Sequence, residues 1–201
     1  MKLIYTLLGL TVLLLIWSAI NPFEYFTWFL EVLPAVIGVL VLIFTFKKFR
    51  FTNFVYVLIF FHCVILIVGG HYTYVEVPLF DWMQETFNKT RNNYDKVGHF
   101  AQGLVPAMIA RELLGRKKVI NSNSWLNFVV VCIAMAISVA YEFIEWAVSL
   151  GTGEGGDSFL GTQGYIWDTQ SDMLYATIGA ILTLIIFGEY HRSQINKLMS
   201  N

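Results

Sequence analysis

The sequence predicts an all-α integral membrane bundle of six transmembrane helices, in a single domain that covers residues 1–201. Of the 201 residues, 57% are hydrophobic and only 13% carry a charge, and the mean hydropathy is +0.62. This composition is too apolar for a soluble domain of this size. Six stretches are long enough to cross a bilayer, which takes about 20 apolar residues. They are residues 3–20, 28–46, 53–73, 97–114, 125–150 and 170–188.

The first stretch, residues 3–20, is expected to stay in the protein as a helix. It is too long for the apolar core of a signal peptide, and no Ala-x-Ala cleavage pattern follows it. Pro34 and Pro106 fall inside the second and fourth stretches, which a membrane bundle tolerates when neighbouring groups satisfy the freed carbonyl. Between the third and fourth stretches, residues 78–87 begin with Pro and repeat apolar residues at fourfold spacing. This pattern predicts a short surface helix.

Basic residues alternate between the connections and so predict an orientation. They flank one end of the predicted spans at Lys2, Lys47, Lys48, Arg50, Arg111, Arg116, Lys117, Lys118, Arg192 and Lys197. The connections 21–27 and 151–169 contain no Lys or Arg, and 74–96 mixes basic with acidic residues. Because cytoplasmic loops carry the excess of Lys and Arg, both termini are predicted to be cytoplasmic. We interpret GTGEGG, residues 151–156, as an outer loop, since no strand precedes it.

The predicted orientation brings seven ionisable side chains to one level of the membrane, near its outer face. They are His71, Asp95, His99, Glu142, Glu145, Asp168 and Asp172. Spacings of three and four residues place several of them on shared helix faces. The sets are Asp95, His99 and Gln102; Ser138, Glu142 and Glu145; and Asp168 and Asp172. Ionisable groups that face hydrocarbon cost several kcal/mol, so such groups pair, line water or bind a ligand.

We therefore expect a shared polar pocket. His99, Glu142 and Asp172 should point into it, with His71 at the rim and Lys96 as a counter-charge to an acid. Asp95, Glu145 and Asp168 should lie around it. Three simpler interpretations remain open. Asp95 and Asp168 could cap helices, His71 could belong to an interfacial aromatic belt, and the whole group could be a structural network.

Two histidines among several carboxylates suit a divalent ion such as zinc, manganese or iron(II), which a bundle core can hold between facing helices. The expected ligands are His71, His99, Glu142 and Asp172. A bound metal would activate water to hydrolyse a lipid or envelope substrate, with Asp95, Glu145 and Asp168 as acid–base groups. The alternatives are a proton- or cation-coupled transporter and a non-catalytic structural or partner-binding protein. Membrane lipids are the expected partners, and the net charge of −1 gives no reason to expect nucleic acid.

Several motifs together carry a resemblance to a known family. They are GGHYTY, RNNYDKVGHFAQG, ARE, YEFIEW and WDTQSDM. In this combination the chain resembles the bacterial inner-membrane family typified by YjdF along nearly its whole length. That resemblance implies a multi-pass protein of the inner membrane and no particular reaction. More distantly, residues in the fourth to sixth stretches are similar to VanZ-like membrane proteins, with Ala176 where those chains usually have Asn.

Overall fold

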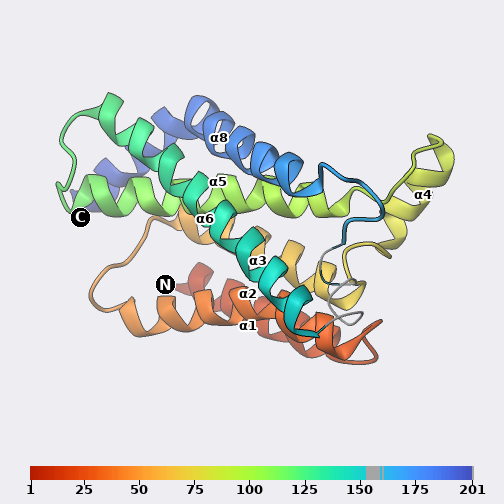
Figure 1. The fold of residues 1–201 in the computed structure, drawn as a ribbon. Coiled ribbons are helices and arrows are strands. Elements are labelled where there is room, and N and C mark those ends of the chain that lie inside the picture. Colours follow the sequence, from red (N-terminus) through yellow and green to blue (C-terminus); the bar gives the residue numbers. More distant parts are fainter. Residues whose placement is uncertain (153–158, 160, 201) are drawn as a thin grey trace.

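The computed structural model describes residues 1–152, 159 and 161–200, and the regular elements within these residues are helices without any strand (Figure 1). The helices are α1 Lys2–Ser18, α2 Tyr25–Thr45, α3 Asn53–His71, α4 Pro78–Thr86, α5 Tyr94–Arg116, α6 Asn123–Thr152 and α8 Asp168–Met199. The predicted short surface helix is confirmed as α4, with Pro78 in its first turn. The predicted outer loop GTGEGG lies largely outside the described residues.

Four of these helices, α2, α3, α6 and α8, are long and apolar enough to cross a membrane. Their outward faces carry large apolar side chains, such as Phe44 at 78% exposure and Ile185 at 73%. Exposed apolar surface of this extent is suited to hydrocarbon and not to water. The apolar helix α1 has 17 residues, which is short for a span, and α5 is rich in polar residues. Length and composition therefore support four of the six predicted spans.

Helix α5 is the polar helix at the centre of the bundle. It packs against α3, α6 and α8, and 11 of its 23 residues are buried. Four of the buried residues are Lys, Arg, Glu or His: Lys96, His99, Arg111 and Glu112. Because its neighbours cover it, α5 presents little surface to lipid and does not need the uniform apolar surface of the other helices.

The closest approach between helices joins α5 to α8. A Cβ atom added at Gly103 would lie 1.7 Å from the carbonyl oxygen of Ala176, and one at Gly179 would lie 2.1 Å from the carbonyl oxygen of Phe100. Only glycine lets the two backbones touch in this way, as small residues commonly do in membrane bundles. This contact fixes the position of the polar residues on both helices relative to each other.

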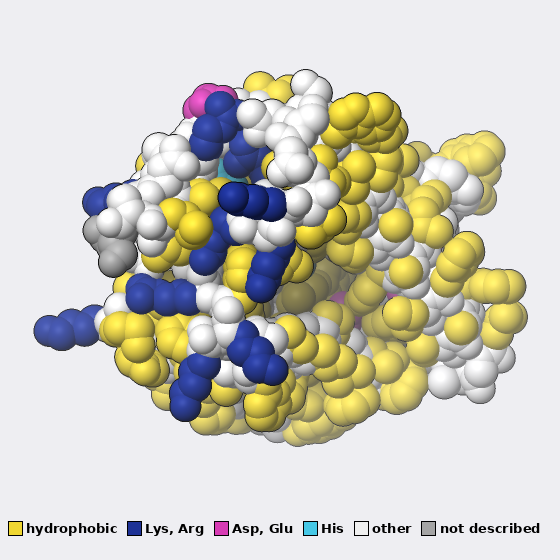
Figure 2. Space-filling model, turned by 90° about the vertical axis from the view of Figure 1, so that its left-hand side faces the viewer, with side chains coloured by type: hydrophobic (Ala, Val, Ile, Leu, Met, Phe, Trp, Pro, Cys, Tyr) yellow, Lys and Arg dark blue, Asp and Glu magenta, His cyan; other side chains and the backbone are white. Residues whose placement is uncertain are grey.

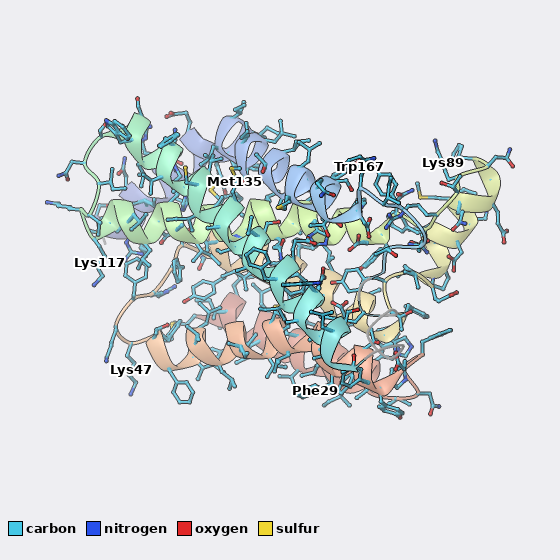
Figure 3. The ribbon with its side chains drawn as sticks, in the orientation of Figure 1. Phe29, Lys47, Lys89, Lys117, Met135 and Trp167 are labelled. Carbon is cyan, nitrogen blue, oxygen red and sulfur yellow. The ribbon has the colours of Figure 1, made fainter. Side chains whose placement is uncertain are left out.

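The helices form two groups. Helices α1 and α2 pack on α3, whereas α5, α6 and α8 pack on one another, and the packing of α3 on α5 joins the groups. One end of the bundle carries Lys47 and Lys117, and the other carries Lys89 and Trp167 next to α4 (Figure 3). We call these the lysine end and the α4 end.

Candidate functional site

An acidic cluster lies at the α4 end, where α5, α6 and α8 meet. It consists of Asp95, Lys96, His99, Glu142, Glu145, Asp168 and Asp172, and all but the partly buried Asp95 are buried. Apart from Lys96, these residues come from the shared faces that the sequence indicates on three helices. The helix contact through Gly103 and Gly179 brings those faces together.

Lys96 supplies the main positive charge within the cluster. Its ammonium Nζ donates to Asp172 Oδ1 at 2.5 Å and to Asp168 Oδ1 at 2.6 Å, and it lies 3.4 Å from Asp95 Oδ2. The expectation that Lys96 is a counter-charge is confirmed, with three acids as its partners. Arg91, which precedes α5, also pairs with Asp168 and lies 3.6 Å from Asp95. The sequence reasoning missed Arg91 because it stands in the connection between two helices.

His99 lies at the junction of the acids. Its Nε2 is 3.2 Å from Asp95 Oδ1 and 3.8 Å from Asp172 Oδ1, and its Nδ1 is 3.8 Å from Glu142 Oε1. One ligand atom from each of Asp95, His99 and Asp172 can be chosen so that the three lie within 4.8 Å of one another. The expected convergence of His99, Glu142 and Asp172 is therefore present.

One buried carboxylate oxygen of Glu142 lacks a hydrogen-bond donor. Its Oε1 is buried and has no hydrogen-bond partner among the described residues, and the same holds for the hydroxyl of Ser138 one turn earlier. Leaving a buried carboxylate oxygen without a donor costs about 1–3 kcal/mol or more. Such an atom beside His99 is well placed to accept a ligand.

A cavity of about 210 Å³ adjoins the acidic cluster. Helices α2, α3, α5 and α6 line it together with the connection after α3. Its lining residues in the described part of the chain are Glu31, Pro34, His62, Leu66, Tyr74, Asp95, Gly98, His99, Gln102, Pro106, Ile137, Tyr141 and Glu145. Of the residues expected around a shared pocket, Asp95, His99 and Glu145 line this cavity, whereas Glu142, Asp172 and His71 are not among its lining residues. The cavity also reaches further into the bundle than the acidic cluster itself.

The cavity brings in two ionisable residues that the sequence reasoning missed, Glu31 and His62. Glu31 is 5% exposed and accepts a hydrogen bond from Tyr141 Oη at 3.3 Å, and His62 Nε2 is buried with no partner among the described residues. Each lies within a long apolar stretch, and an ionisable residue there is a signal of function in a membrane helix.

His71 does not join the acidic cluster, which corrects its expected place as a ligand. Its Nδ1 lies 2.9 Å from the carbonyl oxygen of Ser18, and its ring packs 4.5 Å from that of Trp17. The residues of the motif GGHYTY pack against one another and against Trp17. The ring of Tyr74 occupies the space that a side chain at Gly69 would fill, and Tyr74 lines the cavity.

The helix-cap interpretation of two aspartates is also corrected. Helix α5 begins at Tyr94 after Asn93, and α8 begins at Asp168 after Trp167, with no side-chain cap bond at either start. Asp95 and Asp168 lie inside the first turns and direct their carboxylates to Lys96 and Arg91.

A second polar group, the Glu112 cluster, lies towards the lysine end of the same two helices. It consists of Thr52, Arg111, Glu112, Arg116 and His191. Glu112 Oε1 accepts from the Thr52 backbone N–H at 2.9 Å and from Arg116 at 2.7 Å. Its Oε2 accepts from the Thr52 hydroxyl at 2.8 Å and lies 2.9 Å from His191 Nε2. Each oxygen of this fully buried carboxylate thus has two partners.

The charges of the acidic cluster do not balance within the described residues. Its five carboxylates, with Glu31 across the cavity, face two permanent cations, Lys96 and Arg91. In a medium of low dielectric constant such an excess requires protons or a bound cation. The arrangement can therefore hold a divalent ion or carry protons.

Comparison with known proteins places the chain in a family. Residues 3–193 match the family DUF2238, described as "Predicted membrane protein". The chain is 46% identical over 185 residues to the "Inner membrane protein YjdF" of Escherichia coli (strain K12), an alignment that covers 92% of this chain and 88% of the relative. The resemblance seen in the motifs is thereby confirmed. No solved structure matches the chain.

Proposed function

Since the chain belongs to the DUF2238 family of membrane proteins, we propose that residues 1–201 form one inner-membrane domain of six spans. Both termini would be cytoplasmic, and the acidic cluster would face the other side. Lys and Arg side chains gather on the lysine end, as expected for the cytoplasmic face (Figure 2). Reporter fusions after Arg50 and Lys118 should report cytoplasm, and fusions within 78–90 the outside. An extracytoplasmic signal after Lys118 would contradict the proposal.

We propose further that Asp95, His99 and Asp172 hold a divalent metal ion, with Glu142 as a fourth ligand. The observation that carries this proposal is the meeting of three ligand atoms within 4.8 Å beside the unpaired Glu142 Oε1. Imidazole and carboxylate ligands suit zinc, manganese or iron(II). His71 is left out of the ligand set because its Nδ1 is engaged with Ser18.

The proposed reaction is hydrolysis of a lipid or envelope substrate. A bound metal would supply Lewis acidity and a water molecule of lowered pKa. Glu145 lines the cavity and is the best candidate for a general base. Asp168 is held by Arg91 and Lys96, so we assign it the positioning of Lys96.

Metal content tests this proposal directly. Protein purified in mild detergent should contain about one zinc, manganese or iron ion per chain by elemental analysis. His99→Ala and Asp172→Asn should lose the ion, because each removes a ligand. Glu189→Gln, which alters an exposed carboxylate of α8, should keep it. Wild-type protein that stays free of metal when these ions are supplied, and is not stabilised by them, would rule out the metal site.

A second candidate function is proton or cation transfer across the membrane. It is favoured by Glu31 and His62, which extend the ionisable groups from the acidic cluster into the bundle along the cavity. Liposomes that contain the protein should then show a proton or cation flux that Glu31→Gln abolishes. Metal-free protein with such a flux would favour transfer over hydrolysis.

A further inference from the structure

The cavity beside the acidic cluster is lined by negative and not by positive side chains. Three carboxylates, those of Glu31, Asp95 and Glu145, border it, and its lining residues within the described chain include no Lys or Arg. Lys96 and Arg91 pair with Asp168, Asp172 and Asp95, so Asp95 already has cationic partners. No Lys or Arg of the described chain pairs with Glu31 or Glu145. A ligand that enters the cavity therefore meets acceptors of hydrogen bonds and negative charge, which select a cationic donor.

Part of the cavity lining is apolar. Pro34, Leu66, Pro106 and Ile137 line it. A small, fully hydrated cation gains nothing from such a wall, whereas a molecule with a charged head and a hydrocarbon body matches both sides.

The cavity lies where the two helix groups meet, between α2 and α3 on one side and α5 and α6 on the other. Helices α2 and α6 belong to different groups and are not packed along their lengths. The hydrogen bond from Tyr141 Oη to Glu31 Oε2 links them across the gap. Figure 2, which looks at the lysine end, shows a hollow bordered by hydrophobic side chains with Asp or Glu side chains at its floor. A border of this kind suits the hydrocarbon part of a lipid.

We propose that the cavity binds the primary ammonium group of a membrane lipid, which enters between α2 and α6 and pairs with Glu31. The buried Nε2 of His62 has no partner among the described residues and adds a polar contact for the same headgroup. The assignment of this lipid as a substrate rests on the proposed hydrolytic function. The binding itself does not require the metal.

Native mass spectrometry of the detergent-purified chain tests the proposal. The probes are phosphatidylethanolamine and phosphatidylglycerol with identical acyl chains, because only the first carries an ammonium group. Wild-type protein should retain the ethanolamine lipid about tenfold better, since a hydrogen bond between charged groups contributes about 1.5–3 kcal/mol. Glu31→Gln should lose this preference. Glu189→Gln makes the same change at an exposed site and should keep it.

Further arms of the experiment separate the alternatives. Tyr141→Phe removes the link between α2 and α6 but keeps the Glu31 charge, so it should keep the preference even where Glu31→Gln fails to fold. Free ethanolamine should not displace the lipid. Equal retention of both lipids by wild type, a preference that persists in Glu31→Gln, or displacement by free ethanolamine would overturn the proposal. Glu31→Gln should keep its metal, so failure of the lipid site and failure of the metal site give different results.

Discussion

Two buried glutamates on neighbouring helices have opposite surroundings. Glu112 on α5 has two partners for each carboxylate oxygen and lies next to Arg111, Arg116 and His191. Glu142 on α6 lies among other acids, and its Oε1 has no partner in the described chain. A carboxylate with all its acceptor sites filled has no capacity left for a ligand, whereas one with an unpaired oxygen carries an unfavourable free energy that a ligand can relieve. A buried charge alone therefore does not identify a ligand-binding site. A buried carboxylate oxygen without a hydrogen-bond donor does.

The same substitution in the two glutamates should give the largest contrast. Glu112→Gln removes the charge that holds Arg116 and His191 and should lower the free energy of unfolding by about 3–5 kcal/mol. Glu142→Gln removes a charge that is paired only with His99, 3.8 Å away and without a hydrogen bond to Oε1, and should be neutral or stabilising in metal-free protein. Denaturant unfolding in detergent micelles measures both. Equal losses of stability in the two variants would remove the distinction between a structural and a binding cluster.

Replacing the internal cation of the acidic cluster should sharpen the comparison. Lys96→Met leaves Asp168 and Asp172 with less positive charge, so added zinc or manganese should stabilise this variant more than the wild type. A metal present at a hundred times its dissociation constant stabilises by about 2.7 kcal/mol. Thermal unfolding with and without metal measures the gain, and Lys117→Met at the lysine end is the control. A gain no larger than that of the control would show that the acids do not attract a metal.

The contact between α5 and α8 supports both clusters, so disturbing it should affect them together. Gly103→Ala forces a methyl group onto the backbone of Ala176 and should cost about 1–3 kcal/mol or somewhat more. Gly38→Ala on α2 meets no atom within 4 Å and should be neutral. Unfolding of the purified variants measures the difference. If Gly103→Ala were as stable as Gly38→Ala, the two backbones would not touch as described.

The smallest effect is expected at His71. His71→Phe keeps an aromatic ring against Trp17 and loses the hydrogen bond to Ser18, so stability should change by about 0.5–1.5 kcal/mol. Metal content should not change. A loss of metal in elemental analysis would show that His71 is a metal ligand, contrary to its position beside Ser18 and Trp17.

The sequence predicted the helices and the convergence of the acids because both follow from local patterns. Apolar stretches indicate spans, and spacings of three and four place Asp95 with His99 and Glu142 with Glu145 on shared faces. The position of His71 could not be predicted, since it depends on how Trp17 of α1 packs against the end of α3.

The contribution of α2 and α3 to the cavity could not be predicted from the sequence either. No spacing of three or four residues connects Glu31 or His62 with another ionisable residue. Whether they face lipid or a cavity is decided by the rotation of each helix in the bundle. That rotation depends on contacts such as the one between Gly70 of α3 and Glu31 of α2.

The long helix α8 sets the distance between the two polar layers. Asp172 of the acidic cluster and His191 beside Glu112 lie 19 positions apart on it, which corresponds to about 28 Å at 1.5 Å per residue. The hydrocarbon core of a typical bilayer is about 30 Å thick. Because α8 is a continuous helix held against α5 by backbone contact, this spacing cannot adjust as separate side chains could. The fixed spacing of the two polar layers on α8 therefore matches a bilayer of one thickness. A thicker bilayer would have to thin locally around the protein or cover one of its charged layers with lipid tails.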